Sequence, residues 1–215
     1  AKNLKMIQRT GVGTEMLDKE EIKRRGIPVY VNAGVNARSV AEHTLTLMLA
    51  CLKRIPFIDK QVRNGIWKKQ ETGTSCHELY GKTVGLVGMG AIGRQVAEYL
   101  NVFGAKILYT DVHQLSPEQE QKLNATYIPS FEKMLSQVDI LSLHCPLTNE
   151  NKEMLNEQTI AMMKSNATII NTARGKLINE SALYHALKEG RISAAGLDVH
   201  YEEPIFTENN LLSTL

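Results

Sequence analysis

The sequence has little cysteine, almost no net charge and no long apolar run. Its three cysteines, Cys51, Cys76 and Cys145, are widely spaced and odd in number. That pattern argues against a disulfide framework and a metal site, and it favours a reducing, cytoplasmic setting. Lys and Arg total 25 against 23 Asp and Glu, a net charge of +2, which is too small an excess for a nucleic-acid partner. No apolar run reaches the roughly 18 residues that span a bilayer, so we expect no membrane partner.

The composition that remains is that of an ordinary globular protein. The chain has 215 residues, of which 43% are hydrophobic and 22% charged. Domains usually contain about 100 to 200 residues. The length therefore allows one large domain, or one domain and part of a second.

Short β-branched runs alternate with helical stretches from Lys82 onward. This alternation is typical of βαβ units and a parallel sheet. We expect strands at 83–88, 106–111, 125–128, 139–145, 167–173 and 194–199. Several of these runs are almost entirely apolar, as strands covered on both faces must be. The predicted fold class is α/β, a Rossmann-type doubly wound parallel sheet with helices on both faces.

Helix signals lie between these runs. Asn179 and Gly190 bracket one helix, and Ser130 opens another that continues through Gln137. The apolar stretch 40–52 predicts a buried or interfacial helix, ended by Pro56. The sequence shows no internal repeat and no low-complexity linker.

Residues 1–32 stand outside the alternation. They contain two strand-like pieces, 4–8 and 28–32, around a helix-like piece at 17–24. One such unit supplies too few strands for a sheet of its own. We therefore expect residues 1–32 to be a fragment of a second α/β domain and residues 33–215 to form the main domain.

The strongest local motif is Gly88-Met89-Gly90-Ala91-Ile92-Gly93, directly after a predicted strand and before a helical stretch. In such a loop the first glycine permits a tight turn, and the second lets the backbone approach a pyrophosphate. The third lets the helix pack close to the strand. The unpaired N–H groups at the helix start then face the phosphates. The motif predicts a dinucleotide-binding site.

Asp111 ends the next predicted strand, where an acceptor for the ribose hydroxyls of the cofactor is expected. Its carboxylate would repel a 2′-phosphate, and the following residues offer no arginine to hold one, so NAD is favoured over NADP. The alternative is that the glycines serve only a tight turn and that Asp111 caps a loop.

Several motifs resemble the D-isomer-specific 2-hydroxyacid dehydrogenases. The segments that carry the resemblance are 9–13 (Arg-Thr-Gly-Val-Gly), 40–44 (Val-Ala-Glu-His-Thr), 144–148 (His-Cys-Pro-Leu-Thr), 171–175 (Asn-Thr-Ala-Arg-Gly) and 196–204 (Gly-Leu-Asp-Val-His-Tyr-Glu-Glu-Pro). They are specific in order and spacing, and they cover nearly the whole chain. The resemblance implies that residues 1–32 belong to a flavodoxin-like substrate domain.

The resemblance also implies catalytic roles. Arg174 would clamp the substrate carboxylate, a task that suits a planar, always charged guanidinium. Glu203, rather than its neighbour Glu202, would pair with a catalytic histidine and raise its pKa. That histidine is expected beyond Leu215, so we expect this chain alone to turn over no substrate. His43 and His144 are interpreted as structural.

The implied binding residues fall into two groups. The cofactor residues are Val12, Gly88, Gly90, Ala91, Ile92, Gly93, Asp111, Cys145, Pro146, Thr172, Ala173, Arg174 and Asp198. Asp198 would accept from the nicotinamide carboxamide or hold Arg174. The substrate residues are Gly11, Val12, Gly13 and Arg174, with backbone N–H groups of the glycine loop meeting a carboxylate.

The function expected from the resemblance is hydride transfer between NAD(H) and C2 of a small D-2-hydroxy or 2-keto acid. The alternative is an NAD-sensing regulator that resembles the C-terminal-binding transcriptional corepressors, because a fold does not settle a function. The apolar helix at 40–52 and the residues after it also predict a homodimer through the NAD-binding domain.

Overall fold

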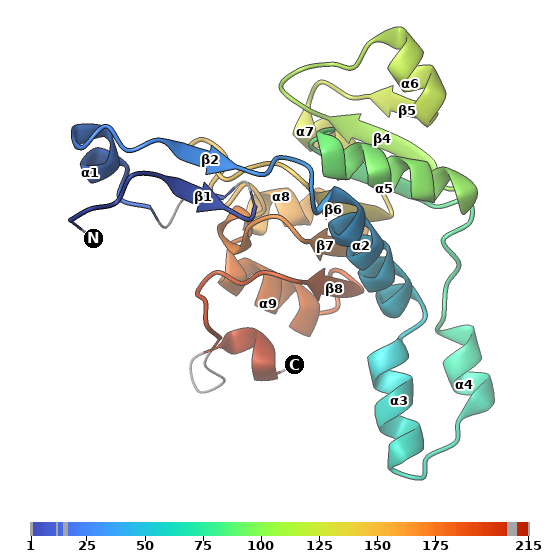
Figure 1. Ribbon diagram of the computed structural model, residues 1–215. Helices are drawn as coiled ribbons and strands as arrows, with labels where there is room; N and C mark the ends of the chain where they lie inside the picture. Colours follow the sequence, from blue (N-terminus) through green and yellow to red (C-terminus); the bar gives the residue numbers. More distant parts are fainter. Residues whose placement is uncertain (1, 12, 15–16, 206–209, 215) are drawn as a thin grey trace.

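A small α/β unit opens the chain. The computed structural model describes residues 2–11, 13–14, 17–205 and 210–214. Strands β1 (Ile7–Arg9) and β2 (Val29–Val31) pair in parallel as a two-stranded sheet, with α1 (Lys19–Arg24) between them in sequence. Helix α1 begins where the side chain of Asp18 accepts the N–H of Glu21, a standard N-cap. This unit lies beside the main sheet, as Figure 1 shows.

The main body is a six-stranded sheet in which every neighbouring pair is parallel. Its strands are β3 (Thr83–Val87), β4 (Lys106–Thr110), β5 (Ala125–Tyr127), β6 (Ile140–Leu143), β7 (Thr168–Asn171) and β8 (Ala194–Leu197). Their order in the sheet is β5-β4-β3-β6-β7-β8. The chain runs outward from β3 to one edge, then returns to β6 and runs to the other edge. This is the doubly wound Rossmann order, with its switch point between β3 and β6. The predicted fold class is confirmed.

Helices cover both faces of this sheet. They are α5 (Ala91–Val102), α6 (Pro117–Leu123), α7 (Phe131–Leu135), α8 (Glu157–Ala161) and α9 (Glu180–Lys188), with 3₁₀ turns at Gly175–Leu177 and Leu211–Thr214. The predicted N-caps are confirmed, because Asn179 accepts the N–H of Ala182 and Ser130 that of Lys133. The helix after Ser130 ends at Leu135, two residues before the predicted end.

Two apolar clusters form the core, one on each face of the sheet. Neighbouring residues of one strand enter opposite clusters: Ile140 packs with α2 and α5, whereas Leu141 packs with α7 and α8. Ile170 and Ile169 of β7 divide in the same way. Alternation across a strand with both faces apolar is the pattern of a parallel sheet buried on both sides.

Three helices link the small unit to the main sheet: α2 (Ala37–Leu52), α3 (Ile55–Arg63) and α4 (Lys69–Thr74). The expected buried helix is therefore present, but the prediction that Pro56 ends it is wrong. Helix α2 stops earlier, next to Arg54 in the left-handed conformation (φ 51°), and Pro56 lies in the first turn of α3. Proline is tolerated there because the N–H it lacks has no helical partner. Helices α3 and α4 project away from the sheet (Figure 1). Among the described residues, no helix has both the length and the apolar character needed to cross a membrane.

The strands stop short of the predicted ends. The sequence predicts strands that continue through Gly88, Asp111, Cys145, Ala173 and Val199, but pairing stops one to two residues earlier. The N–H groups of Gly88, His144 and Asp198 still bond to the neighbouring strand, and the regular ladder ends after them. The N–H of Ala173, in contrast, bonds to the side chain of Asn171 instead of to a strand. The residues wrongly assigned to strands are largely those of the candidate site.

Candidate functional site

One row of residues lines the carboxyl edge of the main sheet. The last residues of five strands lie in register: Val87 pairs with Thr110 and Leu143, Leu143 with Asn171, and Asn171 with Leu197. The residues that follow them are neighbours along one edge: Asp111, Gly88, His144, Thr172 and Asp198. Open α/β sheets bind ligands at this edge, next to the switch point.

The glycine loop after β3 is shaped by two close approaches. Gly88 has φ +100°, and a Cβ there would lie 2.9 Å from the backbone N of Cys145. At Gly93 a Cβ would overlap the carbonyl oxygen of Gly88. Only glycine fits either position, because a side chain would separate the loop from the strand or from the adjacent segment. The roles predicted for Gly88 and Gly93 thus have a structural basis.

Gly90 differs from both of these glycines. It lies at the N-terminus of α5, where no side chain caps the helix, and a Cβ at this position would meet nothing within 4 Å. The N–H groups of the first helical turn have no partner within the helix and lie at the positive end of the helix dipole. That arrangement fits a pyrophosphate, and a side chain at Gly90 would occupy part of the same space.

Asp111 joins the end of β4 to the glycine loop. Its Oδ2 accepts the N–H of Met89 at 2.6 Å, and its Oδ1 accepts that of His113 at 3.2 Å. A carboxylate oxygen has two lone pairs, so both oxygens keep an acceptor position for ribose hydroxyls. The loop after Asp111 contains no basic residue except His113. Val112 and His113 are both exposed, Val112 at 90%. These contacts fit the predicted ribose site.

The segment after β6 lies against the glycine loop. The Nε2 atom of His144 bonds to the Ser142 hydroxyl at 2.9 Å, while its Nδ1 is buried without a hydrogen-bond partner among the described residues. Burial lowers the pKa of His144 to about 4 and raises that of Cys145 to about 11. Both side chains are therefore uncharged near neutral pH. The side chain of Asn151 braces the turn by donating to the carbonyl of Pro146 at 2.8 Å.

Arg174 lies in a loop that the side chain of Asn171 organises. The Asn171 Oδ1 accepts the N–H of Ala173 at 3.0 Å, and the Asn171 Nδ2 donates to the carbonyl of Arg174 at 2.9 Å. The guanidinium is half-buried, and its Nη1 donates to the carbonyl of Ala173 at 2.7 Å. The loop therefore holds a charged, planar donor group at the carboxyl edge of β7.

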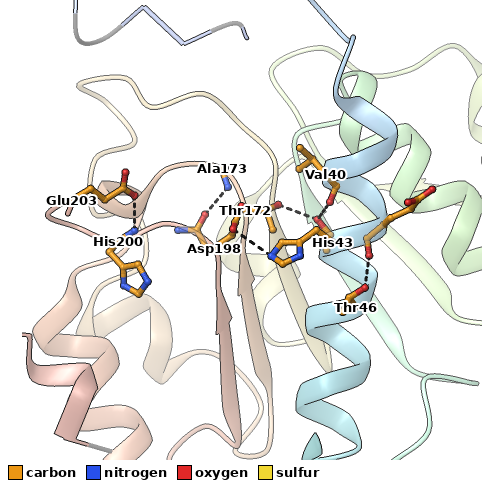
Figure 2. Close-up of polar contacts among 11 residues, drawn as sticks. Val40, His43, Thr46, Thr172, Ala173, Asp198, His200 and Glu203 are labelled. Carbon is orange, nitrogen blue, oxygen red and sulfur yellow. Dashed lines mark hydrogen bonds and ion pairs between the residues drawn. The ribbon is translucent and has the colours of Figure 1, made fainter. Parts of the chain in front are cut away.

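Arg174 and Glu203 belong to segments that touch. A Cβ at Gly175 would overlap the carbonyl of His200, so the two backbones are in direct contact. Glu203 is exposed, and its Oε1 accepts the N–H of His200 at 2.9 Å. Figure 2 shows this carboxylate on the loop that follows β8. The choice of Glu203 over Glu202 stays a prediction.

Helix α2 contacts the same edge from one face of the sheet. The Nε2 of His43 lies 3.3 Å from Oδ1 of Asp198, and the hydroxyls of Thr44 and Thr172 are 3.0 Å apart (Figure 2). The resemblance implies the carboxamide or Arg174 as the partner of Asp198; the structure adds a histidine. The sequence predicts a structural role for His43 on an apolar helix; its side chain is 46% exposed and lies beside Asp198.

The glycine loop of the small unit is described only in part. Gly11 and Gly13 follow β1, and Nε of Arg9 donates to the carbonyl of Gly13 at 2.9 Å. Val12 lies outside the described residues. The substrate role of this loop stays a prediction.

Sequence patterns do not identify three residues of the site: His43, Thr44 and Asn171. Asn171 stands at the end of a strand and two residues before the loop it braces, a spacing typical of Asx turns. That signal was available. His43 and Thr44 reach the site only because α2 crosses the ends of β7 and β8, which no local pattern predicts.

The fold and the edge residues together define a class, the dinucleotide-binding domains of the Rossmann type. Residues 45–214 match the NAD-binding domain of the D-isomer-specific 2-hydroxyacid dehydrogenases. The chain belongs to this family, and the resemblance in its motifs is confirmed.

Curated relatives and solved structures agree with this assignment. The chain is 42% identical over 213 residues to a glyoxylate reductase of Thermococcus litoralis, covering 97% of this chain and 64% of the relative. It is 39% identical over 220 residues to a D-3-phosphoglycerate dehydrogenase of Methanocaldococcus jannaschii, covering 100% and 41%. A D-lactate dehydrogenase from Aquifex aeolicus, complexed with NAD and lactic acid, superposes with a TM-score of 0.83 at 36% identity, covering 93% and 59%. The chain thus spans about 64% or less of these relatives.

Proposed function

We propose that the protein to which this chain belongs is an NAD-dependent oxidoreductase that moves hydride between the cofactor and C2 of a small D-2-hydroxy or 2-keto acid. The observation that carries the proposal is the placement of Arg174. It lies half-buried at the carboxyl edge of β7, in a loop braced by Asn171, two residues after Thr172 of the edge row. A guanidinium there is suited to hold a carboxylate beside the nicotinamide.

The remaining roles follow from this placement. NADH, when bound, supplies the hydride. Arg174 orients the 2-keto acid by two parallel hydrogen bonds to its carboxylate and polarises the adjacent carbonyl. Gly11, Val12 and Gly13 contribute backbone N–H groups to the substrate carboxylate. Glu203 supports a histidine proton donor, which is predicted to follow Leu215.

The substrate class is that of small 2-keto and 2-hydroxy acids, such as glyoxylate, hydroxypyruvate, pyruvate and phosphoglycerate-type substrates. Names of similar proteins support this range, since relatives at about 40% identity are called glyoxylate reductase and hydroxypyruvate reductase. A cytoplasmic location is proposed with it, supported by three free cysteines.

The test is NADH oxidation by the full-length protein with a panel of 2-keto acids. We expect turnover with at least one of them. Replacing Arg174 by Lys should reduce kcat/KM at least a hundredfold, because the second parallel hydrogen bond is lost. Glu203→Gln should lower turnover far more than the matched variant Glu202→Gln. Tight NADH binding without turnover of any acid would contradict the proposal and favour an NAD-sensing regulator.

A further inference from the structure

Two consecutive residues of α2 bind the ends of two adjacent strands. Thr44 is fully buried and meets Thr172 after β7, and His43 meets Asp198 after β8. The Thr44 hydroxyl also donates to the carbonyl of Val40 at 2.8 Å, so its position on the helix is fixed. Figure 2 shows the His43 ring pointing from α2 toward the Asp198 carboxylate.

The packing of α2 brings His43 within reach of Asp198. At Gly196, a Cβ would lie 3.0 Å from Cβ of Leu47 and 3.3 Å from Sγ of Cys51. The helix can therefore approach β8 this closely because Gly196 carries no side chain. Ala41 and Met48, on the face of α2 that packs against the sheet, are fully buried and fix the rotation of the helix about its axis. Consequently His43 has a defined position relative to the end of β8.

The Asp198 side chain depends on this contact for its orientation. Its backbone is fixed, because its N–H bonds to the carbonyl of Asn171 at 3.0 Å. Its side chain is 47% exposed, and its ion pair in the described part of the chain is the one with His43. An exposed carboxylate without a partner samples several rotamers in water. The Nε2 of His43 can donate to it both as imidazolium and as the Nε2–H tautomer.

Stability does not account for this pair. Ion pairs whose two side chains are about half exposed contribute little to the free energy of unfolding, because water screens them and ordering two side chains costs entropy. The pair instead fixes one carboxylate in the row of residues at the cofactor edge. Thr172 and Asp198 are the members of that row farthest from the ribose-side Asp111, on the far side of the glycine loop.

We propose that His43 is a positioning residue that holds the Asp198 carboxylate in the orientation that receives the nicotinamide end of the cofactor. This inference rests on the proposed function for the placement of the nicotinamide. It assigns to α2 a part in cofactor recognition that is separate from the glycine loop and from Asp111. The adenosine half of the cofactor does not depend on it.

The test compares two ligands of the full-length protein, NADH and ADP-ribose, which lacks the nicotinamide. We expect His43→Leu to weaken NADH binding three- to tenfold and to leave ADP-ribose binding unchanged. His43→Gln should restore most of the NADH affinity, since its amide can still donate to Asp198. The matched control is His185→Leu, because His185 lies on exposed α9 surface and contacts the carbonyl of Ser181. It should change neither affinity.

A double-mutant comparison covers the case in which the leucine variant alone is poorly folded. In an Asp198→Ala background, His43→Leu and wild-type His43 should bind NADH equally, because the partner is absent, whereas a poorly folded leucine variant would still bind more weakly. Equal weakening of both ligands by His43→Leu, or no weakening of either, would overturn the inference. Selective loss of NADH binding in a protein that turns over no acid would support it while the proposed function fails.

Discussion

Oδ2 of Asp111 accepts the backbone N–H of Met89 at 2.6 Å. This single contact ties the end of β4 to the glycine loop that follows β3. The other oxygen accepts the N–H of His113, so one carboxylate fixes two loops. A charged acceptor makes stronger hydrogen bonds to N–H groups than a neutral one. The same carboxylate is placed to receive ribose hydroxyls and to repel a 2′-phosphate.

Replacing Asp111 by Asn tests this double role. We expect the preference for NADH over NADPH to fall at least tenfold, which is about 1.4 kcal/mol, because the charge that repels the 2′-phosphate is removed. Fluorescence titrations with both cofactors measure it. Glu98→Gln is the matched control, since Glu98 is an exposed carboxylate on α5 that bonds to Gln95. An unchanged preference in Asp111→Asn would place the ribose elsewhere.

Gly90 and Gly93 are predicted to respond oppositely to alanine. Gly93→Ala forces a Cβ onto the carbonyl of Gly88 and should lower the free energy of unfolding by about 1 to 3 kcal/mol. Gly90→Ala meets open space and should change stability by less than about 0.5 kcal/mol. It should nevertheless weaken NADH binding about tenfold or more, because its methyl group enters the pyrophosphate position.

Urea denaturation and NADH titration of the two variants give both quantities. Each variant serves as the control for the other, since the chemical change is identical. Loss of stability in Gly90→Ala, or full NADH affinity in that variant, would contradict the phosphate role of the loop.

Local patterns in the sequence predict the parallel strands, the glycine loop and Asp111, because each depends on residues that are neighbours in the chain. The ends of the strands are less predictable, since apolar residues such as Val199 continue the pattern after backbone pairing has stopped. The contacts of α2 could not be predicted at all. Thr44 and Thr172 are 128 positions apart, and helix periodicity indicates the buried face but not which strand end that face meets.

The stability of the fold is predicted to fall in acid because of His144. Burial lowers its pKa to about 4, whereas an imidazole in an unfolded chain titrates near 6.5. Between these values the unfolded chain binds a proton that the folded protein does not, so stability is present above pH 6.5 and is lost as the pH falls toward 4. A difference of this size corresponds to at most about 3 kcal/mol.

Urea denaturation at pH 7.0 and pH 4.5 measures this contribution. In His144→Gln the decrease in stability between the two pH values should be smaller than in the wild type by about 2 kcal/mol. Because the carboxylates titrate in both proteins, their contribution to the pH dependence of stability cancels in this comparison. His185→Gln, at an exposed position, should behave like the wild type. Equal decreases in His144→Gln and the wild type would show that His144 takes up its proton without cost.

Homodimerisation through the arm of α3 and α4 is the last prediction. Five apolar side chains of this arm are exposed: Ile55, Phe57, Val62, Ile66 and Trp67, the last at 76%. Exposed apolar groups gathered on one projecting arm are typical of a protein interface, where Trp contributes much of the binding energy. Trp67 is the single tryptophan of the chain, so its emission reports this surface alone.

We expect sedimentation to give a dimer at micromolar concentration and the emission of Trp67 to shift to the blue as the dimer forms. Replacing Phe57 and Ile66 by Ser should shift the equilibrium toward monomer, because each replacement removes buried apolar area. The control is Val112→Ser, an apolar and 90% exposed position outside the arm, in the loop that follows β4. A monomer at all concentrations, with unshifted Trp67 emission, would leave the arm available for a different partner and contradict the dimer.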